Sequence, residues 1–196
     1  MRKLISLLAI LFISGCGTTS SVKMATQLPD KTAFVFLDER PTDQRLSRTV
    51  NGISGENVYF GDDNLSPSAP ALLKAWLQNK SAIELTGKQI TLLEFTVNIY
   101  DPSVSVDSSR LNTAAASVPG GYAAAPFAGL LIGGIERIRS EKIVYIKIQG
   151  KVGADEFFAV GSERFQGRVT EENVQATLIR TLDKAVAEVR QVAGAK

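Results

Sequence analysis

The chain has 196 residues, of which 44% are hydrophobic and 21% are charged, and its formal net charge is +2. Histidine is absent and there is a single cysteine, which excludes histidine-based acid–base catalysis, Ser-His and Cys-His nucleophile pairs, His-containing zinc sites and an internal disulfide. We therefore expect a non-enzymatic protein with no catalytic residues, no metal site and no cofactor.

The first sixteen residues predict a lipoprotein signal peptide. Two basic residues precede the apolar run 4–13, and Ile13-Ser14-Gly15-Cys16 resembles the bacterial lipobox. The run is too short to span a bilayer, which takes roughly 20 residues. We expect residues 1–15 to be removed and Cys16 to carry acyl chains that anchor the protein in a membrane. An ordinary secretory signal and an uncleaved membrane anchor are the alternatives.

Removal of the signal peptide leaves 181 residues with 20 basic and 20 acidic side chains, so the mature charge is zero. Nucleic-acid binding is not expected, because it normally requires a basic surface. Gly17, and not an aspartate, follows the cysteine, which favours the outer membrane, with the domain facing the periplasm. Residues 16–31 are small and polar and predict a flexible lipidated linker, followed by a single domain over residues 32–196.

A charged segment, DERPTDQR over residues 38–45, follows a short apolar strand at 32–37. Alternating charges in a short loop predict mutual ion pairs, and we expect a bidentate contact between Arg40 and Asp43. The alternative is an interaction patch or cation site formed by Asp38, Arg40, Asp43 and Arg45. We favour the structural interpretation.

The remaining elements follow from hydrophobic periodicity. Residues 68–80 predict a helix with Trp76 as a core anchor, and in residues 89–100 Leu93 and every second residue after it are expected to face the core. The other elements are a short strand at 57–60, a hairpin of 141–152 with 156–166, and a long amphipathic helix at 170–192. This order predicts an α+β two-layer sandwich, with two helices packed on one face of a mainly antiparallel sheet.

An uncharged Ala/Gly-rich segment, residues 117–135, interrupts this pattern. Gly121, Ala125, Gly129 and Gly133 recur every four residues, so on a helix they would form one face of small side chains. One hypothesis is that the segment enters the membrane or packs against a second copy of the chain. The other is a loop that folds over the domain's own core, which the prolines and glycines of the segment favour.

The lipobox, the Arg-x-Thr-Asp-Gln segment at residues 40–44 and the order of elements together resemble the YajG-like family of bacterial outer-membrane lipoproteins. The resemblance runs from Asp38 to about Val192, and the insert at 117–135 departs from it. It implies an uncharacterised, non-enzymatic envelope protein. A more distant resemblance is to the small auxiliary lipoproteins of envelope lipid transporters.

The sequence is compatible with three functions. The first is a lipid-anchored envelope protein that binds or braces another envelope component, with an envelope protein of unknown identity as its partner. The second is an oligomer-forming or membrane-inserting lipoprotein that acts through residues 117–135. An enzyme of peptidoglycan or lipid metabolism is the third and the least favoured, because no activated nucleophile is evident.

Overall fold

A computed structural model describes residues 21–52, 55–102 and 141–194 of the chain. Cys16 and the segment 117–135 lie outside these residues. The described elements, in chain order, are β1 (Val22–Lys23), β2 (Val35–Asp38), the 3-10 helix η1 (Thr42–Gln44), β3 (Arg48–Gly52), β4 (Gly55–Phe60), β5 (Leu65–Ser66), α1 (Ala69–Ser81), β6 (Gln89–Asp101), β7 (Glu141–Val152), β8 (Asp155–Gln166) and α4 (Glu171–Gly194).

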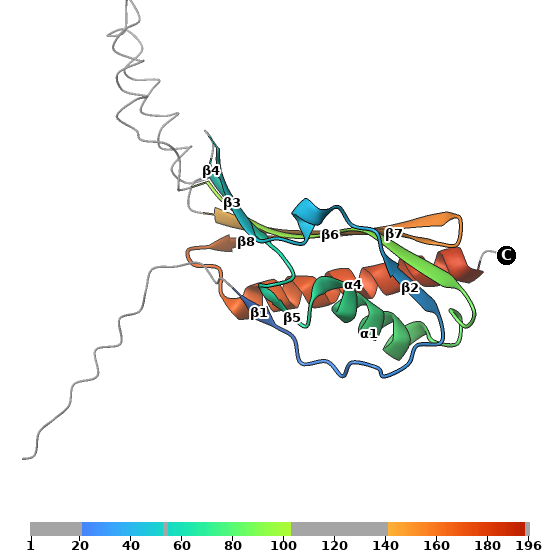
Figure 1. Ribbon diagram of the computed structural model, residues 1–196. Coiled ribbons are helices and arrows are strands. Elements are labelled where there is room, and N and C mark those ends of the chain that lie inside the picture. The colour runs from blue at the N-terminus through green and yellow to red at the C-terminus, as the bar shows by residue number, and fades with distance from the viewer. Residues whose placement is uncertain (1–20, 53–54, 103–140, 195–196) are drawn as a thin grey trace, which may run out of the picture.

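The main sheet has the strand order β3-β4-β6-β7-β8, and each neighbouring pair is antiparallel. β2 adds a parallel strand beside the first residues of β6. β1 and β5 form a separate two-stranded parallel sheet. α1 and α4 lie on one face of the main sheet (Figure 1). The predicted α+β two-layer sandwich is therefore confirmed.

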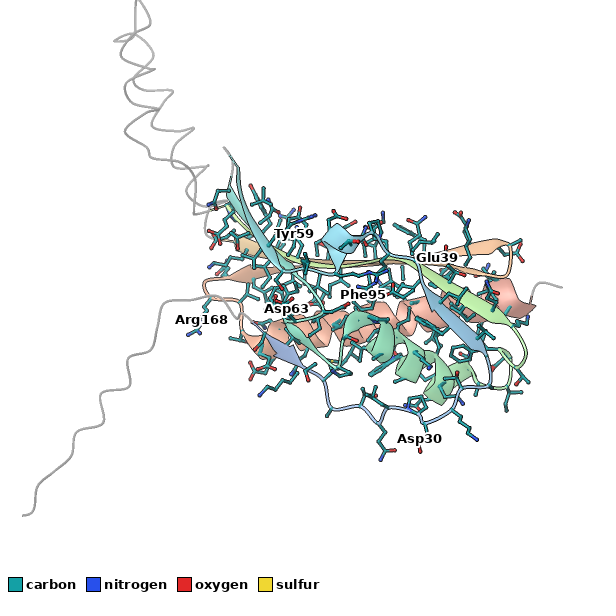
Figure 2. The ribbon with its side chains drawn as sticks, in the orientation of Figure 1. Asp30, Glu39, Tyr59, Asp63, Phe95 and Arg168 are labelled. Atoms are coloured by element: carbon teal, nitrogen blue, oxygen red, sulfur yellow. The ribbon has the colours of Figure 1, made fainter. Side chains whose placement is uncertain are left out.

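The core lies between the sheet and the two helices. Phe95 of β6 points into this layer (Figure 2). Seven apolar side chains of α4 form the stripe that the sequence predicts, and all of them are buried: Val174, Leu178, Leu182, Ala185, Val186, Val189 and Ala193. Each large apolar side chain buried in this way contributes about 1.5–3 kcal/mol, so packing against α4 is a main source of stability.

The alternation expected along β6 is wrong at Leu93. The pairing of β6 with β7 shifts register between Leu92 and Glu94, so one extra residue is inserted there. Leu92 and Phe95 are buried in the core, whereas Leu93 is only partly buried. Such a bulge moves the following side chains to the other face of the strand, which a strict period of two cannot anticipate.

The expected flexible linker of residues 16–31 is too long, because the described fold begins at β1. Val22 is fully buried, and its N–H donates to Asn64 O at 2.8 Å. The N–H of Met24 donates to Ser66 O at 2.7 Å. A strand of two residues is too short to show hydrophobic periodicity, so the sequence pattern did not reveal it.

The next strand, predicted at residues 32–37, is observed as β2 at Val35–Asp38. It is extended only where it pairs with β6.

Candidate interaction surfaces

The charged segment after β2 is organised by a buried arginine. The Arg40 side chain is 1% exposed, and its Nε and Nη2 donate to the two carboxylate oxygens of Asp38 at 2.8 and 3.0 Å. Nη2 also donates to Asp62 Oδ2 at 2.8 Å. The other oxygen of Asp62 accepts a hydrogen bond from the N–H of Ala69, the first residue of α1. Arg40 therefore links the end of β2, the turn after β4 and the start of α1.

The expected bidentate contact between Arg40 and Asp43 is wrong. Asp43 lies in η1 and accepts from Arg48 Nη1 at 2.9 Å, whereas Arg40 points inward to Asp38. Arg45 donates from Nε and Nη2 to the carbonyl oxygen of Arg40. The structure therefore joins three of the four candidate patch residues, and places Asp43 in a separate, exposed pair.

The electrostatics of this cluster keep both partners charged. Partial burial of the Asp38 carboxyl raises its pKa. The hydrogen bonds and the positive charge of Arg40 lower the pKa by more, so it falls below its ordinary value of 3.8. For the cationic Arg40, burial has the opposite effect and lowers the pKa, but the hydrogen bonds to Asp38 and Asp62 raise the pKa by more. A buried arginine with both carboxylates satisfied is typical of a structural ion-pair network.

The face of the sheet that points away from α1 and α4 carries exposed apolar and aromatic side chains. Val50, Tyr145 and Phe158 are 46%, 37% and 51% exposed. The Arg48 guanidinium lies 4.7 Å from the centroid of the Tyr59 ring, and the Lys147 ammonium lies 5.5 Å from that of Phe158. We call this the open sheet face. Periodicity identified β4, β6, β7 and β8, but it did not identify β3, nor that this face lacks an α-helical cover within the described residues.

Charges on the open sheet face are paired across strands. Lys147 contacts Glu94 at 2.6 Å, and longer ion pairs join Lys151 to Glu156 and Arg164 to Glu141. These pairs contain equal numbers of positive and negative groups. Among the described residues, the open sheet face therefore offers aromatic and apolar contacts beside paired charges, which suits a protein partner better than a polyanion.

A groove of about 480 Å³ lies on the helix side of the molecule, between β1, β5, α1 and α4. Met24, Trp76 and Ile179 line it together with Lys23. Trp76 packs against the core as predicted, but it is only partly buried, and its Nε1 donates to Asp183 Oδ1 at 2.8 Å. This hydrogen bond joins α1 to α4 over 107 residues of sequence, so no local pattern predicts it.

The remaining candidate residues, Cys16 and the four small residues Gly121, Ala125, Gly129 and Gly133, lie outside the described ranges. Within those ranges, no group of acidic or cysteine side chains is arranged to bind a metal ion. Neither described helix is both long and apolar enough to cross a bilayer.

Comparison with models of known protein families, with curated proteins and with solved structures found no match to this chain. The resemblance to the YajG-like family therefore stays a prediction. Within the described residues, the fold is an α+β two-layer sandwich in which one sheet face carries no α-helix.

Proposed function

We propose that this chain is a non-enzymatic, lipid-anchored envelope protein whose periplasmic domain binds or braces another envelope component at the outer membrane. The observation that carries the proposal is the short distance in sequence between the lipobox cysteine and the folded domain. Cys16 precedes the fully buried Val22 by six residues. A chain extends at most about 3.3–3.6 Å per residue, so an acylated Cys16 would hold the domain within about 20 Å of its membrane.

The open sheet face is the surface we assign to the partner, which we propose is an envelope protein. Tyr145 and Phe158 are exposed there beside the Lys147 side chain. Protein interfaces are enriched in aromatic residues and depleted in unpaired charge at their centres, which suits this face better than the charged loop around Arg40. Arg40 itself is buried and is not available for contact with a partner.

Intact-mass measurement of the native protein tests the anchor. We expect a chain that begins at Cys16 and carries the added mass of its acyl groups, and we expect a Cys16→Ser variant to lose both that mass and membrane association. A native protein with a free thiol and no added hydrocarbon would refute the proposed location and role together.

Site-specific photo-crosslinking in cells tests the partner surface. A photoreactive side chain at Tyr145 or Phe158 is expected to give one discrete adduct with another envelope protein. The same group at Ile83, which is 89% exposed but lies after α1 and away from the open sheet face, serves as the matched control. Equal adducts at Ile83, or none at either sheet position, would contradict this assignment.

One observation favours the second function, action of residues 117–135 on the membrane or on another copy. The described chain stops after β6 and resumes at β7, and the ends of these strands lie at the same end of the molecule as β1 (Figure 1). Glu141 pairs with Gln166 just before α4, and Glu171 of α4 accepts a hydrogen bond from the Lys23 N–H. The proposed anchor and the apolar segment are therefore attached to the same end.

Deletion of residues 120–134 in a Cys16→Ser background separates this second function from the first. We expect the undeleted Cys16→Ser chain to retain vesicle binding or self-association if residues 117–135 act in this way, and the deleted chain to lose it. A monomeric Cys16→Ser chain that stays out of vesicles would eliminate the second function.

A further inference from the structure

The point at which the chain enters the fold is fixed on the helix side of the molecule. Beside the buried Val22, the N–H of Lys23 donates to Glu171 Oε1 at 2.6 Å, and the Lys23 carbonyl accepts from Gln175 Nε2 at 2.5 Å. Both partners lie in the first turns of α4. The position at which the chain enters the described fold is therefore set by contacts with α4.

The groove lies directly beside this entry point, because Lys23 belongs to both. Lys23, Met24 and Ala25 form one wall, and Trp76 of α1 and Ile179 of α4 form the rest of its apolar surface. An acylated Cys16 lies within about 20 Å of Val22 because only five residues separate them. The far end of α4 is less accessible to the anchor, since 24 residues of helix extend about 36 Å from Glu171.

We propose that this groove docks on the lipid surface that holds the acylated Cys16, so that Met24, Trp76 and Ile179 contact the headgroups and first methylenes of the bilayer. The inference rests on the proposed acylation of Cys16. It turns the helix side of the domain toward the membrane and leaves the open sheet face toward the periplasm.

The chemistry of the groove suits a lipid surface. Ile179 is 38% exposed, and the Trp76 ring combines an apolar body with an N–H that is hydrogen-bonded to Asp183. Tryptophan of this kind is typical of the region between headgroups and acyl chains. The exposed Lys23 places an ammonium group at the groove, whereas Lys80, 5.1 Å from the Trp76 ring centroid, is paired with Asp183. A lysine such as Lys23 interacts favourably with anionic headgroups when it lies near a bilayer.

Weak contacts are sufficient for this docking. Linking two binding elements through a short chain makes the second contact intramolecular, with an effective concentration in the millimolar range for short flexible linkers. The groove therefore needs little affinity of its own for lipid, and we expect it to dock only when Cys16 is acylated.

Trp76 is the only tryptophan of the chain, so its fluorescence reports on the groove alone. The acylated full-length mature protein is placed in vesicles of phosphatidylethanolamine and phosphatidylglycerol, with or without bromine on the acyl chains. We expect brominated lipid to quench Trp76. Trp76→Phe combined with Phe158→Trp moves the only indole to the open sheet face, where we expect no quenching.

Matched charge substitutions test whether the groove itself makes the contact. Ile179→Glu is expected to lower the ratio of docked to undocked protein about tenfold, equivalent to about 1.4 kcal/mol. Ile83→Glu, at an exposed isoleucine outside the groove, is expected to leave Trp76 quenching unchanged.

Three results would overturn the proposal: no quenching of Trp76, equal quenching in both glutamate variants, or an indole at position 158 that is quenched as strongly as Trp76. A groove filled by a second copy, or by the protein's own acyl chain, would give the first of these. Intact mass is measured on the same samples, so the absence of acylation, which refutes the proposed function, is distinguished from a wrong orientation.

Discussion

The guanidinium of Arg40 holds together three segments that are separate in sequence. Its partners are Asp38, two residues before it, and Asp62, 22 residues after it. The sequence shows that residues 38–45 are rich in opposite charges, and this correctly indicates ion pairing. It does not show which charges meet, because Asp62 reaches Arg40 only after β3 and β4 have paired.

Arg40→Ala is expected to destabilise the domain by about 3 kcal/mol, because removal of one partner from a buried ion pair leaves the other uncompensated. Arg48→Ala removes an exposed ion pair with Asp43 and is expected to cost less than about 1 kcal/mol. Urea unfolding of non-acylated Cys16→Ser chains measures both free energies. Equal losses in the two variants would show that the Arg40 network contributes no more than a surface pair.

Packing between β8 and α4 depends on close contact at Gly161. A Cβ atom added at this glycine would collide with the Thr181 hydroxyl, and Thr177 lies directly beside it. Both threonines are buried, and the Thr181 hydroxyl donates to the Thr177 carbonyl at 2.8 Å. A glycine inside a strand allows this close approach of the helix.

Gly161→Ala is expected to lower the free energy of unfolding by about 1–3 kcal/mol through overpacking. Gly194→Ala is the control, because nothing lies within 4 Å of a Cβ atom there. Thr181→Ala in the Gly161→Ala background is expected to recover part of the loss, since it removes the hydroxyl that the new methyl group meets. Purely additive effects of the two substitutions, measured by thermal unfolding, would argue against a direct contact.

Hydrophobic periodicity predicts the long helices and strands of this chain better than the short ones. The predicted strand 141–152 coincides with β7, and the predicted helix 170–192 differs from α4 by one residue at its start and two at its end. These long elements carry several turns or alternations of hydrophobic pattern. β1 and β5 have two residues each and exist only because they pair with one another, so sequence analysis missed both.

At the scale of the whole molecule, the proposed anchor, the groove and the open sheet face have a defined order. β1 enters beside α4, the groove lies on the helix side, and Tyr145 and Phe158 lie on the other face of the sheet. Arg168, in the turn before α4, lies at the end of the molecule that carries β1 (Figure 2). This order would let one domain contact the proposed membrane and the proposed partner at the same time.

Insertion of twelve Gly/Ser residues after Gly17 tests this arrangement as a whole. The longer linker reaches about 60 Å in place of about 20 Å, and the effective concentration of the groove at the bilayer falls. We expect the variant to remain membrane-bound through Cys16 but to show weaker quenching of Trp76 by brominated lipid. Unchanged quenching would mean that the groove's own affinity, and not the short linker, sets the orientation.

The sequence by itself determined the fold class and, apart from Leu93 in β6, the core faces of the long elements, because hydrophobic periodicity is a local property of the chain. It also predicted the ion-pairing character of residues 38–45. Only the tertiary structure decided that Arg40 binds Asp38 and Asp62, that Val22 is buried, and that no described α-helix covers the second face of the sheet. These features depend on contacts between residues far apart in the chain, which form only when the layers assemble.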